Sequence, residues 1–380
     1  MHRQGVCLVG YGETKYTREK RNPISLMASA IKQALDNAGL KKSDIKGFAM
    51  TSISIIDYPA MVAEQLGLEL DWIEGIDCGG ASGVISVRRA GDAIQLGEID
   101  VAVCLGGDPV TQGPPLKMQD YQKSNFVEIY GWGGPNSLFA LTQRRHMAEY
   151  GTTREQLGKI AVSQRKNAEQ NENALFRTPL TMEEYLNARV ICDPIRLFDC
   201  VPIASGAAAV IVASEKKAKE LTKHPIYVVT DCEKTNYHVT DMTLNRLELG
   251  YQSFADRLFS EVSREEIDLA AIYDDYPIAV LMQLENLGFC PMGKGGNFIE
   301  SHDLTTSGDF PLNTGGGQLS GGQAGLTGGY LHVAEAVRQL KGEAGARQVK
   351  GAKTALVTGL GLFGYNLPLT HASAMILQRR

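Results

Sequence analysis

One order of secondary-structure patterns occurs twice along this 380-residue chain, and this repeat limits the possible folds more than any other feature. Near the N-terminus, residues 6–9 form an apolar strand pattern, and residues 24–38 carry apolar side chains at helical spacing. Gly39 follows as a helix C-cap, and an apolar run at 47–50 predicts the next strand. The same order of helix and strand returns in the second half, at residues 247–262 and 269–272.

Each half also contains a glycine-rich turn that precedes a helical pattern and then a buried strand. In the first half these are the turn at 79–83, a helix to about Leu96 and a strand at 99–105. In the second half they are the turn at 321–325, a helix to about Leu340 and a strand at 354–358. Two copies of this order predict a duplicated α/β body, with helices layered on mixed sheets.

The segment between the repeats, residues 109–188, is polar and rich in Gln and Asn. It contains helical patterns at 144–150 and 154–168 but no clear strand, so we expect a lid or loop domain over a site. A buried strand pattern resumes at 205–213. The predicted organisation is therefore the first part of an N-terminal half, the loop domain, the remainder of that half and a C-terminal half, at 1–108, 109–188, 189–222 and 223–380.

Composition excludes several classes of function. The chain is 43% hydrophobic and 21% charged with a net charge of −5, which predicts a substantial core and disfavours nucleic acid as a partner. Seven cysteines without a CxxC pair predict reduced thiols, a cytoplasmic protein and no zinc site of its own. No apolar stretch approaches the roughly 18 residues of a membrane span, so we expect no membrane association.

The two glycine-rich turns suggest chemistry, because a helix N-terminus offers free N–H groups and glycine admits a close approach. Such turns can build an oxyanion hole, or they can simply let two helices pack tightly. A third run, at 359–364, satisfies the GxGxxG pattern. No amphipathic helix pattern follows it, so a nicotinamide cofactor is disfavoured.

Several short motifs together resemble the thiolase superfamily over essentially the whole chain. The branch that this chain is most similar to contains the sterol-carrier-protein-type thiolases and their lipid-transfer-protein relatives. The resemblance implies a duplicated α/β fold of five layers, α-β-α-β-α, with two mixed sheets, an inserted loop domain and a homodimer. The motifs that carry the resemblance lie at 12–15, 80–83, 145–151, 273–276, 312–316 and 359–361.

The chain departs from this family where active thiolases carry their catalytic side chains. Gly80 stands where the nucleophilic cysteine precedes the helix, and Gln323 stands where a histidine activates it. Gly359 stands near the position of the second cysteine. Cys78 lies two residues before the nucleophile position. The glycine framework without these side chains argues against acyl transfer through a cysteine thioester.

The thiolase-like aldolases of steroid side-chain degradation resemble the chain in the loop that reads His-Asp-Cys-Phe in thiolases. This chain has Tyr273 at the histidine position of that loop, as those aldolases do. They carry a second tyrosine where Gln323 stands here. The resemblance implies a retro-aldol cleavage of a β-hydroxyacyl-CoA, in which Tyr273 takes the β-hydroxyl proton and an oxyanion hole stabilises the thioester enolate.

These considerations assign roles to particular residues. Of the neighbouring pair Asp274 and Asp275, we expect only one carboxylate in the site, with Asp274 as the acid/base candidate. His146 is predicted to be a surface residue, and no metal site is expected. The predicted catalytic residues are Tyr273, Asp274, Gln323 and Asn313, the oxyanion-hole donors are Gly80 and Gly361, and the substrate-binding residues are Gly322, Gly325 and Tyr276.

Two alternatives stay open. One is a thiolase or acyltransferase that uses Cys78 or residues of a partner, and the other is a non-catalytic acyl-CoA or lipid-binding scaffold subunit. In either case coenzyme A is part of the substrate and no permanently bound cofactor is expected. The resemblance also implies a separate zinc-ribbon and OB-fold partner chain, since this sequence contains no such module.

Overall fold

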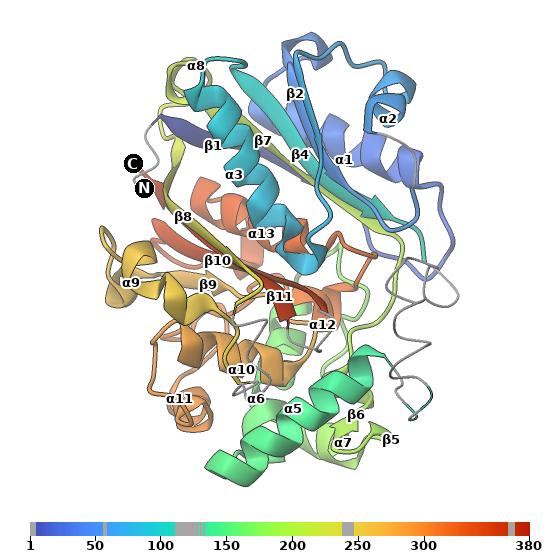
Figure 1. Cartoon of the computed structure of the whole chain (residues 1–380), viewed down its shortest axis with the longest axis vertical. Coiled ribbons are helices and arrows are strands. Elements are labelled where there is room, and N and C mark those ends of the chain that lie inside the picture. The colour runs from blue at the N-terminus through green and yellow to red at the C-terminus, as the bar shows by residue number, and fades with distance from the viewer. Residues whose placement is uncertain are drawn as a thin grey trace.

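The computed structural model describes residues 5–55, 59–110, 134–237, 247–363 and 369–380, together with Ile129 and Gly131. One large mixed sheet runs through the described chain (Figure 1), in the strand order β3-β2-β4-β7-β1-β8-β11-β10-β9. Its strands are β1 (Val6–Glu13), β2 (Gly47–Thr51), β3 (Trp72–Gly75), β4 (Val101–Asp108), β7 (Gly206–Ser214), β8 (Ile226–Thr235), β9 (Leu269–Ala271), β10 (Thr354–Phe363) and β11 (Leu369–Arg379).

The order of strands repeats between the two halves. In the first half β2 lies between β3 and β4 in parallel, and β7 joins β4 to β1 in the antiparallel direction. In the second half β9 and β10 are parallel, and β11 joins β10 to β8 in the antiparallel direction. An isolated bridge from Ala270 to Leu312 stands where β3 would be. The duplication predicted from the sequence is therefore present in the sheet.

The two predicted mixed sheets are not separate in their hydrogen bonding. Strands β1 and β8 pair in the antiparallel direction at Cys7 with Tyr227 and at Leu8 with Ile226. This short ladder joins the halves into one nine-stranded sheet. The two-sheet description still holds for the packing, because each half has its own outer helix layer.

Helices form three layers around the strands (Figure 1). Helix α1 (Pro23–Ala38) covers the outer face of the first half. Helices α3 (Ser82–Gln95) and α13 (Gly328–Lys341) share a central core with strands of both halves. Helix α10 (Pro277–Asn286) covers the outer face of the second half. Side chains alternate between these cores along each strand, which gives the predicted α-β-α-β-α layering.

Most of the predicted elements in the repeats are present. Helix α1 begins after Asn22, whose side chain accepts a hydrogen bond from the Ser25 N–H, and it ends at Gly39 with a φ of 69°. The strand patterns at 47–50 and 99–105 correspond to β2 and β4, with ends shifted by up to three residues.

One predicted helix of the second half is wrong, and two strands were not predicted. The helix predicted over 247–262 is only α9 (Ala255–Leu258), preceded by a 3-10 turn that starts after Gly250 at a φ of 93°. Its apolar residues are buried separately in the core of the second half rather than along one helix face. Strands β8 and β11 had no counterpart in the sequence analysis. The glycine-rich run lies on β10 up to Phe363, residues 364–368 lie outside the described residues, and the chain from Leu369 forms β11 rather than the helix that a dinucleotide site requires.

The segment between the halves is mainly helical where the structure describes it. Helices α5 (Pro135–Tyr150) and α6 (Arg154–Ala168) pack against α10 in one core. A small hairpin of β5 (Val190–Cys192) and β6 (Ile195–Arg196) follows. The remaining short elements are α2 (Pro59–Gln65), α7 (Met182–Asn187), α8 (Glu215–Leu221), α11 (Gly295–Ser301) and α12 (Gly317–Gly321).

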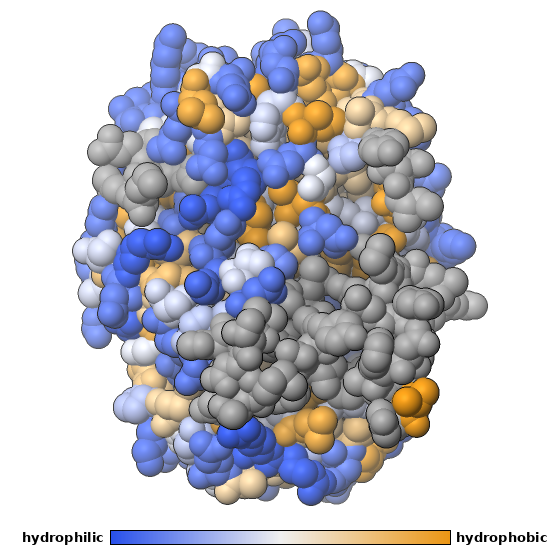
Figure 2. All heavy atoms as spheres, viewed as in Figure 1, coloured by the Kyte–Doolittle hydropathy of each residue, from blue (hydrophilic) through white to orange (hydrophobic). Residues whose placement is uncertain are grey.

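Hydrophilic and hydrophobic side chains are interspersed over the described part of the face in Figure 2. Among the helices that the structure describes, none is both long and apolar enough to cross a membrane.

Candidate active site

The loop between β9 and α10 carries Tyr273 at the centre of the candidate site. The Tyr273 N–H donates to the Thr358 hydroxyl at 2.9 Å, and the Tyr273 carbonyl accepts from Gln283 Nε2 at 2.7 Å. Thr358 lies on β10, and its hydroxyl in turn donates to Gln283 Oε1 at 2.7 Å. Both backbone polar groups of Tyr273 are thus held by buried side chains, which fixes where its phenol ring can reach.

The phenol of Tyr273 lies directly against Gly80. A Cβ atom placed on Gly80 would lie 1.9 Å from the Tyr273 ring carbon Cζ and 2.3 Å from its hydroxyl oxygen. Side chains do not approach so closely, so Tyr273 in this position requires glycine at residue 80. A nucleophilic side chain at residue 80 is therefore incompatible with this tyrosine.

Gly80 and Gly361, the predicted oxyanion-hole pair, are brought together. A Cβ atom on Gly361 would lie 2.0 Å from the Cys78 carbonyl oxygen and 2.9 Å from the Gly80 nitrogen. The other explanation for the glycine-rich turn was tight packing between two helices. Such packing also occurs, but at Gly83 rather than at Gly80. A Cβ atom on Gly83 would lie 2.4 Å from the Gly329 carbonyl, where α3 crosses α13.

Asp275 is the carboxylate beside the tyrosine. It is half-buried and accepts a hydrogen bond from Gln323 Nε2 at 2.8 Å, and its charge acts on the neighbouring Tyr273 hydroxyl. Burial raises its pKa to about 7, against the lowering effect of the Tyr273 hydroxyl and with a further rise from Asp274. Burial also raises the pKa of Tyr273 well above its ordinary value, and the charge of Asp275 adds to this.

Asp274, the predicted acid/base candidate, has a fully buried side chain with three close polar partners. Its carboxylate accepts from the N–H groups of Gln318 at 2.9 Å and Leu319 at 3.1 Å, and it lies 2.9 Å from His332 Nε2. These contacts hold the first turn of α12 and the buried ring of His332 in place. The geometry therefore favours Asp275 over Asp274 as the carboxylate that meets a substrate.

Asn313 holds the strand that leads to Tyr273. Its Oδ1 accepts from the Ile272 N–H at 2.8 Å, and its Nδ2 donates to the Ile272 carbonyl at 2.9 Å. The residue takes a φ of 48°, a conformation that asparagine tolerates better than most residues. Because both ends of the amide bond to backbone, Asn313 acts as a positioning residue in this structure.

The second glycine-rich turn places Gln323 opposite Asp275. The Gln323 N–H donates to the Pro202 carbonyl at 2.8 Å, which anchors the turn to the segment before β7. Gly322 has a φ of 117° and Gly325 a φ of 52°, and a Cβ atom on Gly325 would lie 2.1 Å from Asp108 Oδ2. Both glycines thus shape the turn that delivers Gln323.

Tyr276 connects the same loop to the inserted segment. Its hydroxyl donates to Asn136 Oδ1 at 2.7 Å, and its ring stacks on Phe139 with centroids 4.2 Å apart. Both partners lie on α5. The inserted segment therefore borders the candidate site, and a substrate contact by Tyr276 stays a prediction.

Two further sequence expectations concern Cys78 and His146. Burial raises the pKa of the half-buried Cys78 thiol to about 11, with Glu233 adding to the rise. His146, predicted to be a surface residue, is instead fully buried, with Thr152 Oγ1 at 2.7 Å and Glu285 Oε2 at 3.0 Å. The polar sequence of α5 suggests an exposed helix, but the packed helix α10 carries the buried Glu285, which binds His146.

Several other residues around Tyr273 carry no signal in the sequence. Thr358, Gln283, Gln318 and His332 belong to no motif whose chemistry predicts a site, and only the fold brings them together. Within the described chain, no group of three or more His, Cys, Asp or Glu side chains is arranged to hold a metal ion.

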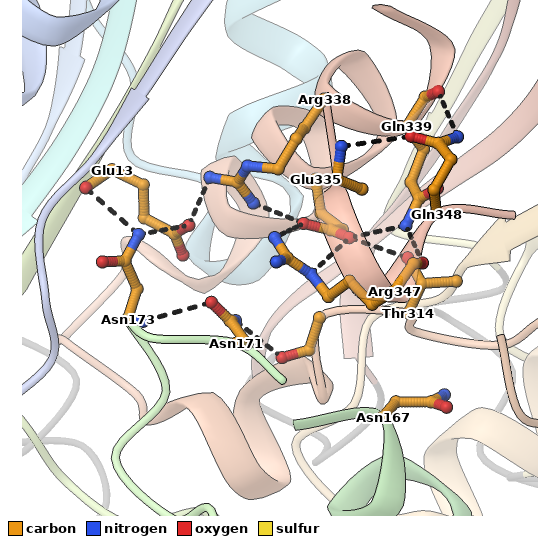
Figure 3. Close-up of polar contacts among 12 residues, drawn as sticks. Glu13, Asn167, Asn171, Asn173, Thr314, Glu335, Arg338, Gln339, Arg347 and Gln348 are labelled. Atoms are coloured by element: carbon orange, nitrogen blue, oxygen red, sulfur yellow. Dashed lines mark hydrogen bonds and ion pairs between the residues drawn. The ribbon is translucent and has the colours of Figure 1, made fainter. Parts of the chain in front are cut away.

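A buried polar network supports the loop at 312–316 (Figure 3). Glu335 on α13 accepts from the Thr314 hydroxyl at 2.9 Å and pairs with Arg338 and with Arg347, the latter at 3.0 Å. Arg338 also pairs with Glu13 on β1 at 2.7 Å. Two carboxylates and two guanidinium groups therefore join β1, α13 and the loop that holds Asn313.

Comparisons with known proteins agree with this architecture. A 17-hydroxy-3-oxo-4-pregnene-20-carboxyl-CoA lyase of Mycobacterium tuberculosis is 30% identical, over 93% of this chain and 95% of that protein. An acetyl-CoA acetyltransferase of Methanothermobacter thermautotrophicus is 29% identical, over 94% of this chain and 96% of that protein. A solved structure, "Ltp2-ChsH2(DUF35) aldolase", matches with a TM-score of 0.87 and 29% identity, over 98% of this chain and 97% of that chain.

Two family models together cover most of the chain. Residues 8–216 match the thiolase N-terminal domain, and residues 249–379 match the thiolase C-terminal domain-like family. With the duplicated strand order, the central helix pair and the paired glycines already in place, these matches lead to one conclusion: the chain belongs to the thiolase family.

Proposed function

We propose that this chain cleaves a β-hydroxyacyl-CoA thioester by a retro-aldol reaction, without a covalent acyl-enzyme. The observation that carries the proposal is the phenol of Tyr273, which fills the space where a side chain at residue 80 would begin. A thiolase of this family needs a cysteine there, whereas a retro-aldol reaction needs an acid/base group and an oxyanion hole.

The reaction balances with the groups present. The β-hydroxyl gives up its proton, its oxygen forms a carbonyl, and the bond between Cα and Cβ breaks. The electron pair of that bond moves into the thioester enolate, which N–H donors at Gly80 and Gly361 stabilise. Cα then takes a proton, which releases a shorter acyl-CoA and an aldehyde or ketone.

The other predicted residues take supporting roles in this proposal. Gln323 binds the acid/base group rather than the substrate, and Asp274 and Asn313 position the loop that carries Tyr273. Gly322, Gly325 and Tyr276 shape the border of the site. The names of the relatives support this reaction class, since one is a CoA lyase and one structure is an aldolase.

Acyl transfer through Cys78 is the second candidate, and the relative named acetyl-CoA acetyltransferase favours it. The environment of Cys78 speaks against it, because a thiol with a pKa of about 11 is protonated at neutral pH. A binding or scaffold role without catalysis would leave the Tyr273–Asp275 contact without a purpose in the site.

We further propose that the chain works with a separate partner chain. The matched aldolase structure carries a DUF35 component in its title. Large apolar side chains are exposed on and beside the inserted segment of this chain, at Leu141, Val190, Leu197 and Ile203. A homodimer stays a prediction from the family resemblance.

The test is product analysis with a panel of short, aromatic and steroid-like β-hydroxyacyl-CoA thioesters, with and without any chain that co-purifies. We expect a shorter acyl-CoA and an aldehyde or ketone in equal amounts. Tyr273→Phe should lower kcat by about 10²–10⁴-fold, as loss of an acid/base group does.

Tyr16→Phe is the matched control, because the buried Tyr16 hydroxyl has no hydrogen-bond partner. It should leave turnover unchanged. Unchanged turnover in Tyr273→Phe would contradict the proposed function.

A further inference from the structure

A carboxyl group, that of Asp275, accompanies the Tyr273 phenol in the candidate site. Tyr273 is buried, and burial together with the nearby charge of Asp275 holds the pKa of its phenol well above the ordinary value. A phenol in this state keeps its proton at neutral pH, so it is a poor final acceptor for a substrate proton. Its neighbour Asp275 differs in that it is only half-buried.

The surroundings of Asp275 suit a carboxyl group that changes protonation. The titratable groups near it are Tyr273, Asp274 and Tyr276 on its own loop, and His332 on α13, which lies 2.9 Å from Asp274. Gln323 donates to its Oδ1 at 2.8 Å and stabilises the charged form. Burial opposes that form, and together these effects place the pKa of Asp275 at about 7.

Gln318 provides a second, independent observation. Its side chain is fully buried and its Nε2 lies 3.5 Å from Asp275 Oδ1, a long contact. Its Oε1 has no hydrogen-bond partner. A 180° flip of the Gln318 amide would turn that oxygen toward Asp275 as an acceptor. The same side chain can therefore bond either a carboxylate, through its N–H groups, or a carboxylic acid, through its oxygen.

We propose that Asp275 is the final proton acceptor of the retro-aldol step and that the Tyr273 hydroxyl relays the proton to it. This inference rests on the proposed function. The substrate β-hydroxyl passes its proton to the Tyr273 oxygen while the Tyr273 proton moves to Asp275, and the bond between Cα and Cβ breaks. The protonated Asp275 returns a proton through Tyr273 to Cα of the enolate, so no other reactant is needed.

The experiment is the pH profile of kcat/KM for the wild type, Asp275→Asn and Gln323→Ala, with any co-purifying partner present. In the wild type, kcat/KM should rise with pH through about 7, because the carboxylate is the active form. Asp275→Asn should lower kcat about 10²–10⁴-fold and remove that rise. Gln323→Ala should keep the rise but move it to higher pH, because it removes a donor that stabilises the carboxylate.

Two further measurements guard against a purely structural effect. In Asp275→Gly, added formate should restore part of the lost rate, which a misfolded protein would not allow. Infrared difference spectra of the wild type should contain a protonated-carboxyl band that titrates near pH 7 and is absent in Asp275→Asn.

The outcomes separate this inference from the proposed function. If the wild type releases no carbonyl product from the panel, the proposed function falls and this inference falls with it. If the wild type is active but Asp275→Asn keeps the rise through pH 7, only the relay to Asp275 is overturned.

Discussion

The contact between Tyr273 and Gly80 explains how one residue can decide the chemistry of a thiolase fold. Glycine at residue 80 follows from the space that the phenol takes, because the position has no room for a Cβ atom. The phenol and a side-chain nucleophile are thus alternatives at one place. In the sequence, Gly80 and Tyr273 are two separate differences from the thiolase pattern. Only the fold shows that the two residues are in contact.

Gly80→Ala is predicted to destabilise the protein by about 1–3 kcal/mol, as overpacking of a well-filled core does. Tyr273→Ala should relieve that cost, so the double variant should be more stable than the sum of the single changes. Urea denaturation of the four proteins measures the coupling. Gly321→Ala is the control, since its Cβ atom would meet only Leu331 Cδ1 at an ordinary 3.4 Å. Additive free energies of unfolding would contradict the contact.

At the scale of elements, the sequence predicted what local chemistry determines. The end of α1 at Gly39 and the helix after the turn at 79–83 were correct, because caps and apolar spacing are local signals. The helix over 247–262 was wrong, because Gly250 breaks it and its apolar residues fill a core formed by distant elements. The difference between Asp274 and Asp275 was beyond prediction, since it depends on which carboxylate the amides of α12 bind.

Asn313 provides a prediction at this scale, because it connects the loop before α12 to the end of β9. Asn313→Gly tolerates the φ of 48° but loses both bonds to Ile272. We expect a cost of about 1–3 kcal/mol in the free energy of unfolding and a fall in kcat larger than the change in KM. The exposed Asn236, with a φ of 51°, gives the control Asn236→Gly. Equal kcat in the wild type and Asn313→Gly would argue against a positioning role.

At the scale of the whole molecule, the buried network around Glu335 joins the two halves beneath the site. Burial by itself would raise the pKa of Glu335, but Arg347 and Arg338 lower it to about 2. In the unfolded chain the pKa of this glutamate is 4.5. The ion pairs of Glu335 therefore stabilise the fold fully above about pH 4.5, and progressively less as the pH falls toward 2. The shift corresponds to roughly 3 kcal/mol.

Glu335→Gln should therefore lower the free energy of unfolding at pH 7 by about 3–5 kcal/mol, because it leaves buried guanidinium groups without their partner. Its stability should also fall less steeply with acid between pH 5 and 3 than that of the wild type. Urea denaturation across that pH range measures both effects, with the exposed Glu98→Gln as the control. The same acid sensitivity in both Glu335→Gln and the wild type would show that the network does not set it.

The central claim is a thiolase-family site that breaks a carbon–carbon bond without an acyl-enzyme. The most direct measurement is the intact mass of the protein, followed by peptide mapping, during the β-hydroxyacyl-CoA product analysis. We predict unmodified protein throughout, together with a shorter acyl-CoA and a matching amount of aldehyde or ketone. An acyl group on Cys78 that forms and decays with turnover would contradict it.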